Sequence, residues 1–231
     1  MRVAIVENTA ITHHGQIGVA LHERAALIEI FRPWRDSILP DPSSHDALVV
    51  FGGEQSALSD KSHPYIPALA ELMQHVAADD RAVLGICLGA QILARGLGAQ
   101  NQIGGAAEFG WHHIRKLDPA GIDPVLGHLP ADFPIFEWHT DTFTLPPNAV
   151  HLAMSPIVRI QAFRAHRAAY GMQFHFEASR AVVADWHRLF GANLDQMAPG
   201  WLQNYARNAE ALGPEADCHG LAIARAWVGL I

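Results

Sequence analysis

Cys87 stands between two glycines, Gly85 and Gly89, at the end of a short apolar run. That run, residues 81–86, predicts a buried strand, and the apolar residues after the cysteine follow helical spacing. The cysteine is therefore expected at a sharp strand-to-helix corner, where glycine avoids the clash that a Cβ would cause. A helix N-terminus directs unpaired N–H groups at such a thiol and favours the nucleophilic thiolate. The alternative is a buried cysteine that packs as a small apolar side chain.

A cysteine nucleophile needs a base within hydrogen-bond reach, and that base needs a third group to fix its tautomer. His175 and Glu177 offer both. Residues i and i+2 of an extended chain project to the same side, roughly 6.6 Å apart, so the glutamate can accept the second imidazole N–H. Taken alone, a histidine at a strand end is more often a polar group without a catalytic role. The carboxylate at this offset and the cysteine elsewhere favour the catalytic interpretation.

A second pair of glycines, Gly52 and Gly53, follows the apolar run 47–51. If this loop lies beside Cys87, the N–H groups of Gly53 and Leu88 are suited to hold the oxyanion of a tetrahedral intermediate. The alternative is a plain turn after a buried strand.

The chain has 231 residues, half of them apolar, which is enough for a sizeable core. Its formal net charge is −7 and its 16 Lys and Arg are scattered, which argues against nucleic acid and against a polybasic membrane surface. No apolar stretch reaches membrane-spanning length, and residues 1–7 predict a strand without the cleavage region of a signal peptide. We expect a cytoplasmic protein that binds neither nucleic acid nor membrane.

The histidines and cysteines give little support for metal or disulfide chemistry. Two cysteines, Cys87 and Cys218, cannot form a disulfide framework and are expected as reduced thiols. Among the 15 histidines, the adjacent pairs at 13–14 and 112–113 point to different sides of a strand or helix and make no natural chelate. We expect no metal and no cofactor, with a metal site assembled from distant residues as the alternative.

Strands and helices alternate through the first hundred residues. Strands are expected at 2–6, 26–31, 47–51 and 81–86, and helices at 16–23, at 64–78 and after Cys87. This alternation indicates a parallel sheet covered by helices on both faces, and ligands gather at the carboxyl ends of such strands. Gly52, Gly53 and Cys87 lie at such ends.

The rest of the chain is expected to be β-rich and then helical. Short strands are predicted at 108–114, 135–138, 150–154, 160–163 and 170–176, and helices from 179, at 201–212 and at 214–228. No linker is evident, so we expect one domain over 1–231, with a core at 1–190 and a helical extension at 191–231. The extension packs on the sheet, covers the site or forms a dimer surface, and packing is the default.

Taken together, these motifs resemble a known family. A Gly-x-Cys-x-Gly-x-Gln stretch at 85–91, a Gly-Gly loop at 52–53 and a His-x-Glu pair at 175–177 are similar to the motifs of the class I (triad-type) glutamine amidotransferases. The stretch 137–146 is similar to the free-standing branch that resembles the amidotransferase domain of GMP synthase. The resemblance covers roughly residues 1–190.

The resemblance implies the chemistry of that family, in which cysteine, histidine and glutamate release ammonia from glutamine. Cys87 is then the nucleophile that forms a γ-glutamyl thioester, His175 the general base and acid, and Glu177 the group that orients His175. The implied oxyanion and substrate contacts fall on Gly52, Gly53, Leu88, Gln91, Thr140 and Asp141. The implied fold is a three-layer, flavodoxin-like α/β arrangement with a mostly parallel central sheet between helices, a β-rich insertion and C-terminal helices.

Two features depart from the family pattern. Phe176 stands between the histidine and the glutamate where the family usually has proline, so the local stiffness of proline is lost. The sequence has no Gly-x-x-x-x-Gly-Lys nucleotide-binding loop, so a synthetase that uses the ammonia is expected as a separate partner. For Thr140 and Asp141, a polar turn is an equally good interpretation.

The sequence thus predicts an enzyme that cleaves a γ-glutamyl amide through a thioester on Cys87. The substrate is glutamine, with ammonia passed to a partner protein, or a γ-glutamylated amine or peptide that is hydrolysed outright. A catalytically silent binding or regulatory protein with the same fold is the alternative from another class. Whether the protein forms a homodimer is left open.

Overall fold

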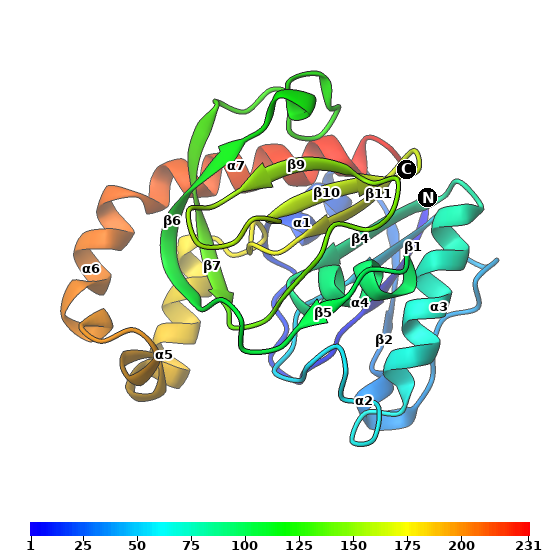
Figure 1. The fold of residues 1–231 in the computed structure, drawn as a ribbon, viewed down its shortest axis with the longest axis horizontal. Coiled ribbons are helices and arrows are strands. Elements are labelled where there is room, and N and C mark those ends of the chain that lie inside the picture. Colours follow the sequence, from blue (N-terminus) through cyan, green and yellow to red (C-terminus); the bar gives the residue numbers. More distant parts are fainter.

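The computed structural model describes the backbone of residues 1–231 and every side chain except that of Ala192. Its nine-stranded sheet has the order β2-β1-β3-β4-β11-β10-β9-β6-β7 (Figure 1). The strands span Arg2–Val6 (β1), Leu27–Phe31 (β2), Ala47–Val50 (β3), Ala82–Ile86 (β4), Glu108–Lys116 (β6), Asp132–His139 (β7), Val150–Met154 (β9), Ala162–Ala165 (β10) and Ala169–Met172 (β11). The part from β2 to β11 is parallel, and the strands beyond β11 continue the sheet antiparallel.

Helices cover both faces of the parallel part. Alternate residues of β1 belong to two different apolar clusters, Val3 and Ile5 to one and Ala4 and Val6 to the other, because successive strand residues face opposite sides. The first cluster is completed by α1 (Gly15–Glu23) and α7 (Gly213–Val228), and the second by α3 (Tyr65–Ala78) and α4 (Leu88–Gly96). The predicted α/β architecture, a parallel sheet between helices, is confirmed.

A third apolar cluster joins α5 (Arg180–Met197) and α6 (Trp201–Ala211) to the antiparallel end of the sheet. Trp111 of β6 and Phe136 of β7 pack there against Trp186 and Trp201. In Figure 1, α5 and α6 lie beside β6 and β7, at the end of the molecule away from α3. The start of the C-terminal extension therefore reaches the edge of the sheet through aromatic side chains.

Several short elements differ from the prediction. The helix α2 (Pro33–Asp36), the strand pair β5 (Asn101–Gln102) and β8 (Thr142–Phe143), and a 3₁₀ turn at Asp118–Ile122 have too few residues for a periodicity to appear. The strand predicted at 160–163 lies at 162–165, where a register irregularity shifts its pairing with β9.

The strand predicted at 170–176 is wrong beyond Met172, because the chain turns there. His175 rejoins the sheet by an isolated bridge, in which its N–H donates to the Phe136 carbonyl at 2.8 Å.

The C-terminal helix α7 packs directly under the segment that carries His175 and Glu177. Trp227 is fully buried in the core, and Gly220 lies so close to the Phe176 carbonyl that a Cβ would stand 2.2 Å from its oxygen. Asp217 accepts hydrogen bonds from the Arg180 N–H at 2.8 Å and from Arg180 Nε at 2.7 Å, at the start of α5. Packing on the sheet, one of the roles left open for the extension, is therefore the role of α7. This helix also contacts the chain at Phe176 and at Arg180.

Within the residues that the structure describes, no helix combines the length and apolar character that crossing a bilayer requires.

We expect Gly220→Ala to destabilise the protein, although alanine is normally the better helix residue by about 1 kcal/mol. The added Cβ meets a backbone carbonyl that cannot rotate away, and overpacking of this kind costs about 1–3 kcal/mol. Denaturant unfolding measures the change. Gly121→Ala, where a Cβ meets open space, is the control. A gain in stability for Gly220→Ala would contradict the packing described here.

Candidate active site

Cys87 forms the turn between β4 and α4, and its backbone adopts φ 53° and ψ −110°. A positive φ costs a residue with a Cβ on the order of 1–3 kcal/mol, so the surrounding structure must hold it. A Cβ on Gly85 would stand 2.4 Å from the Gly89 carbonyl oxygen, and a Cβ on Gly89 would stand 2.0 Å from the Val50 carbonyl oxygen. The predicted strand-to-helix corner is confirmed, and both glycines are explained by close backbone contacts.

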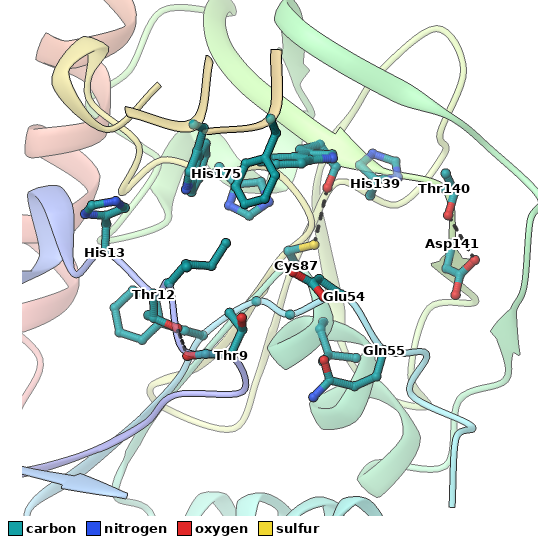
Figure 2. A pocket seen from close by; sticks show the side chains of 18 of the residues that line it. Thr9, Thr12, His13, Glu54, Gln55, Cys87, His139, Thr140, Asp141 and His175 are labelled. Carbon is teal, nitrogen blue, oxygen red and sulfur yellow. Dashed lines mark hydrogen bonds between the residues drawn. The ribbon is translucent and has the colours of Figure 1, made fainter. Parts of the chain in front are cut away.

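The Cys87 sulfur lies at the edge of a cavity, with the side chain 7% exposed. The backbone N–H of Cys87 donates to the Met172 carbonyl at 2.8 Å, and its thiol donates to the Trp138 carbonyl at 3.6 Å (Figure 2). The N–H of Leu88 belongs to the first turn of α4 and has no partner within that helix. The positive end of the helix therefore lies at the sulfur.

His175 and Glu177 form a buried hydrogen-bonded pair, with His175 Nδ1 2.7 Å from Glu177 Oε1. Because an ionised carboxylate only accepts, Nδ1 carries the proton and Nε2 is left for another partner. The backbone of the pair is also fixed, since the Gln16 N–H donates to the Glu177 carbonyl at 2.9 Å. The contact that the spacing predicts is present, although it forms in a turn and not in an extended strand.

Cys87 and His175 both lie against Gly52. A Cβ at residue 52 would stand 3.3 Å from His175 Cε1 and 3.4 Å from Cys87 Cβ. Burial alone would lower the pKa of His175, but the charges of Glu177 and Cys87, together with hydrogen bonds to both, raise this pKa well above its usual value. The imidazolium form, which can give a proton away, is therefore favoured beside the sulfur.

Packing replaces the proline that the family usually has between the histidine and the glutamate. Phe176 is 1% exposed and belongs to the main apolar cluster, where its ring meets that of Phe174 edge to face at 6.5 Å. Gly15, at φ 48°, approaches from the other side, and a Cβ there would stand 1.9 Å from the Glu177 carbonyl oxygen. The segment is thus held by its neighbours in space and needs no stiff residue of its own.

The Gly-Gly loop is held by a polar network that was not predicted from the sequence. Asn8 Nδ2 donates to the Phe51 carbonyl at 2.8 Å, and Gln55 Nε2 donates to the Asn8 carbonyl at 2.9 Å and to Tyr65 Oη at 2.6 Å. A Cβ on Gly53 would stand 2.9 Å from Asn8 Cβ. Partners from three separate segments make the network, so no local pattern in the sequence reveals it.

Gln91 connects α4 to the turn of Thr140 and Asp141. Gln91 Nε2 lies 3.3 Å from the Asp141 carbonyl oxygen and 3.2 Å from Gln173 Oε1, and it donates to both. Asp141 Oδ1 accepts a hydrogen bond from the Gly104 N–H at 2.8 Å. The turn is therefore fixed from two sides.

A cavity of about 590 Å³ lies at the carboxyl ends of the parallel strands. In Figure 2, Cys87 lies between Thr9 and Thr12 on one side and Thr140 and Asp141 on the other. The cavity is lined by all the predicted site residues, Gly52, Gly53, Cys87, Leu88, Gln91, Thr140, Asp141, His175 and Glu177. The lining contributed by the loop between β1 and α1 was not predicted from the sequence. Asn193, Leu194 and Met197 of α5 also line the cavity, and they belong to the extension for which covering the site was one of the open roles.

A second buried network is formed by Glu108, Glu137 and His139, of which His139 lines the cavity. His139 Nε2 is 3.2 Å from Glu137 Oε2 and 3.4 Å from Glu108 Oε2, and Gln161 Nε2 donates to Glu108 Oε2 at 2.7 Å. Burial opposes the charge of His139, but the two carboxylates and Cys87 raise the pKa of this imidazole to about 10. Burial also raises the pKa of Glu137. The cavity lining therefore includes a buried imidazolium, paired with two carboxylates.

The donor atoms of these three residues lie within 4.8 Å of one another, as a divalent cation would need. In the structure the imidazolium of His139 supplies the positive charge between the carboxylates. The absence of a metal stays a prediction.

We expect the stabilising effect of His139 to decrease with rising pH. Its pKa is about 10 in the fold against an ordinary value of 6.5, so the ion pairs stabilise fully below about pH 6.5 and are lost as the pH rises toward 10. The difference in unfolding free energy between wild type and His139→Gln should therefore fall between pH 7 and 10, by roughly 1 kcal/mol per pH unit. Urea unfolding at several pH values measures it, and a constant difference would show that His139 is neutral.

Comparison with known proteins gives the family of the chain. The family model "Glutamine amidotransferase class-I" matches residues 16–184. The glutamine amidotransferase-like protein YfeJ of Salmonella typhimurium is 32% identical over 152 residues, which are 64% of this chain and 63% of that protein. A glutamine-hydrolysing GMP synthase subunit of Methanococcoides burtonii is 29% identical over 58% of this chain and 65% of its own length. The alignments thus span slightly less than two thirds of these relatives.

Solved structures extend the likeness to the whole fold. A glutamine amidotransferase from Methylobacillus flagellatus matches with a TM-score of 0.84 at 25% identity, covering 100% of this chain and 95% of that one. A glutamine amidotransferase from Thermotoga maritima matches with a TM-score of 0.82 at 23% identity, covering 99% of this chain and 96% of that one, and supports the fold alone. On the family match over residues 16–184, the chain belongs to the class I glutamine amidotransferase family.

Proposed function

We propose that the protein cleaves a γ-glutamyl amide bond through a thioester on Cys87, with His175 as general base and acid and Glu177 as the group that orients His175. The observation that supports this most is that a sulfur at the N-terminus of α4 and the hydrogen-bonded His175–Glu177 pair line one cavity. Membership of the family supports the same reaction class.

In the first step His175 Nε2 takes the proton of the Cys87 thiol, the sulfur attacks the γ-carbonyl carbon, a C–S bond forms, and the carbonyl oxygen becomes an oxyanion. The N–H groups of Leu88 and Gly53 are the proposed donors to this oxygen. The C–N bond then breaks, and the His175 imidazolium gives its Nε2 proton to the departing amine. A γ-glutamyl thioester and a free amine result.

In the second step a water molecule attacks the thioester carbonyl, and His175 takes a proton from this water. The C–S bond breaks, glutamate leaves, and the sulfur is regenerated. Glu177 keeps its hydrogen bond to Nδ1 throughout and stabilises the imidazolium that forms. Each proton that His175 gives away in the first step is thus recovered in the second.

We further propose that the amino-acid end of the substrate binds at the turn of Thr140 and Asp141, with Gln91 and Gly52 on the same wall. Two observations support this. The turn lies beside Cys87, opposite Thr9 and Thr12 (Figure 2), and Gln91 Nε2 donates a hydrogen bond to the Asp141 carbonyl, which holds the turn in place. Backbone groups of a rigid turn can recognise α-amino and α-carboxylate groups without a lysine or arginine.

Glutamine is the simplest substrate of this class, and three of the relatives are named as subunits of a glutamine-hydrolysing GMP synthase. By analogy with them, the ammonia would pass to a separate synthetase chain. Outright hydrolysis of a larger γ-glutamyl amine or peptide is the alternative, and the size of the cavity favours it.

We also propose that residues 1–231 act as one domain, because side chains of α7 share an apolar cluster with β1 and β4.

Cys87→Ser is expected to lower the release of glutamate from γ-glutamyl amides at least about 10³-fold, because a hydroxyl is a much weaker nucleophile than a thiol at this pH. Purified protein is incubated with glutamine and with several γ-glutamyl amines, and glutamate is measured. Cys218→Ser is the matched control, since that cysteine is exposed, and it should retain wild-type turnover. Equal turnover in Cys87→Ser would contradict the thioester, and inactivity of the wild type would indicate a silent binding protein.

A further inference from the structure

The cavity is much larger than a γ-glutamyl group requires. Its volume of about 590 Å³ lies in the range of pockets that enclose drug-sized ligands and is several times the size of free glutamine. The turn of Thr140 and Asp141 lies on one side of Cys87, whereas Thr12 and His13 lie on the other (Figure 2). With the amino-acid end bound at the turn, space is left beyond the bond to be cleaved.

An aromatic wall lines this cavity from β7 and α5. The ring of Trp138 meets that of Trp186 at 5.1 Å and that of Phe190 at 5.9 Å, both edge to face. Leu194 and Met197 of α5 line the same cavity, and Met197 is 46% exposed. The wall therefore runs from the interior to the solvent along one face of α5.

This wall begins at the reacting groups. The Trp138 carbonyl accepts the hydrogen bond of the Cys87 thiol at 3.6 Å, and the Trp186 ring meets the His175 ring edge to face at 5.5 Å. In the proposed reaction His175 gives its proton to the leaving nitrogen, so that nitrogen must lie within hydrogen-bond reach of His175. A substituent on the nitrogen is then directed along the aromatic surface beside His175.

The charges around the cavity restrict the substituent further. Among the described residues that line it, none is a lysine or an arginine. His13 is already paired, with its Nε2 2.9 Å from Asp185 Oδ2, and Glu54 adds a carboxylate to the rim. The two imidazolium groups in the lining, His139 and His175, already face the carboxylates of Glu108, Glu137 and Glu177. A leaving amine with its own carboxylate would therefore lose water without gaining an unpaired cation, which is unfavourable. An aromatic group is stabilised by the removal of its apolar area from water and by edge-to-face contacts.

We propose that the preferred substrates are γ-glutamyl amides of amines that carry an aromatic or bulky apolar group, seated on Trp138, Trp186 and Phe190. This inference rests on the proposed γ-glutamyl cleavage and adds the class of the leaving amine. Glutamine releases only ammonia, so it does not contact the aromatic wall and gains no binding energy from it.

A panel of substrates with one γ-glutamyl group and different amines tests this. The amides are glutamine, γ-glutamyl-ethylamide, γ-glutamyl-benzylamide and γ-glutamyl-γ-aminobutyrate, and kcat/KM is measured from released glutamate. We expect the benzylamide to exceed both glutamine and the acidic γ-aminobutyrate amide at least tenfold, with the ethylamide between. Cleavage of glutamine at an equal or higher kcat/KM than the benzylamide would overturn this inference and leave the proposed function standing. Cleavage of none of the four would overturn both.

A pair of neighbouring variants on α5 locates the preference. Phe190→Ala should lower the ratio of benzylamide to glutamine kcat/KM at least fivefold, because Phe190 forms part of the wall. Leu189→Ala is the matched control, since Leu189 is 45% exposed and does not line the cavity, and it should keep the wild-type ratio. An unchanged ratio in Phe190→Ala, or an equal fall in both variants, would overturn the assignment of the wall as the amine site.

Discussion

Direct contact between main-chain segments determines the turn at Cys87. Gly85 lies against the start of α4, and Gly89 lies against the Val50 carbonyl of the neighbouring strand, with no side chain between. This tight packing holds Cys87 at its positive φ, and it thereby keeps the sulfur at the positive end of α4. Every other group proposed for the reaction must be placed by its distance and direction from that sulfur.

The His175–Glu177 pair depends on contacts from both ends of the chain. Gly15, at the start of α1, touches the Glu177 carbonyl, and Gly220, in α7, touches the Phe176 carbonyl. His175 and Glu177 lie in a turn beyond the end of β11, where only an isolated bridge from His175 to Phe136 joins the chain to the sheet. The C-terminal helices therefore contribute to the geometry of the site as well as to the core, and α5 contributes a wall of the cavity.

Features with a local signature were predictable from the sequence. The elbow at Cys87 combines a buried strand, two glycines and a helical period within a few residues, and the His-x-Glu spacing allows a contact whether the chain is extended or turned. Features built from distant residues were not predictable. Glu108, Glu137 and His139 come from two strands of the antiparallel part, and the polar network at Asn8 joins three segments. The aromatic wall of α5 has the spacing of an ordinary core helix, so only its position beside His175 suggests a role in binding.

In the proposed reaction the sulfur of Cys87 becomes bonded to the γ-carbonyl carbon of the substrate. Rapid acid quenching during the first turnover of a γ-glutamyl amide, followed by mass spectrometry of the digested protein, detects this bond. We expect a γ-glutamyl adduct on the peptide that contains Cys87, labile to hydroxylamine as a thioester is, and none on the peptide that contains Cys218. Substrate turnover with no adduct on Cys87, or with the adduct on another residue, would rule out the thioester on Cys87.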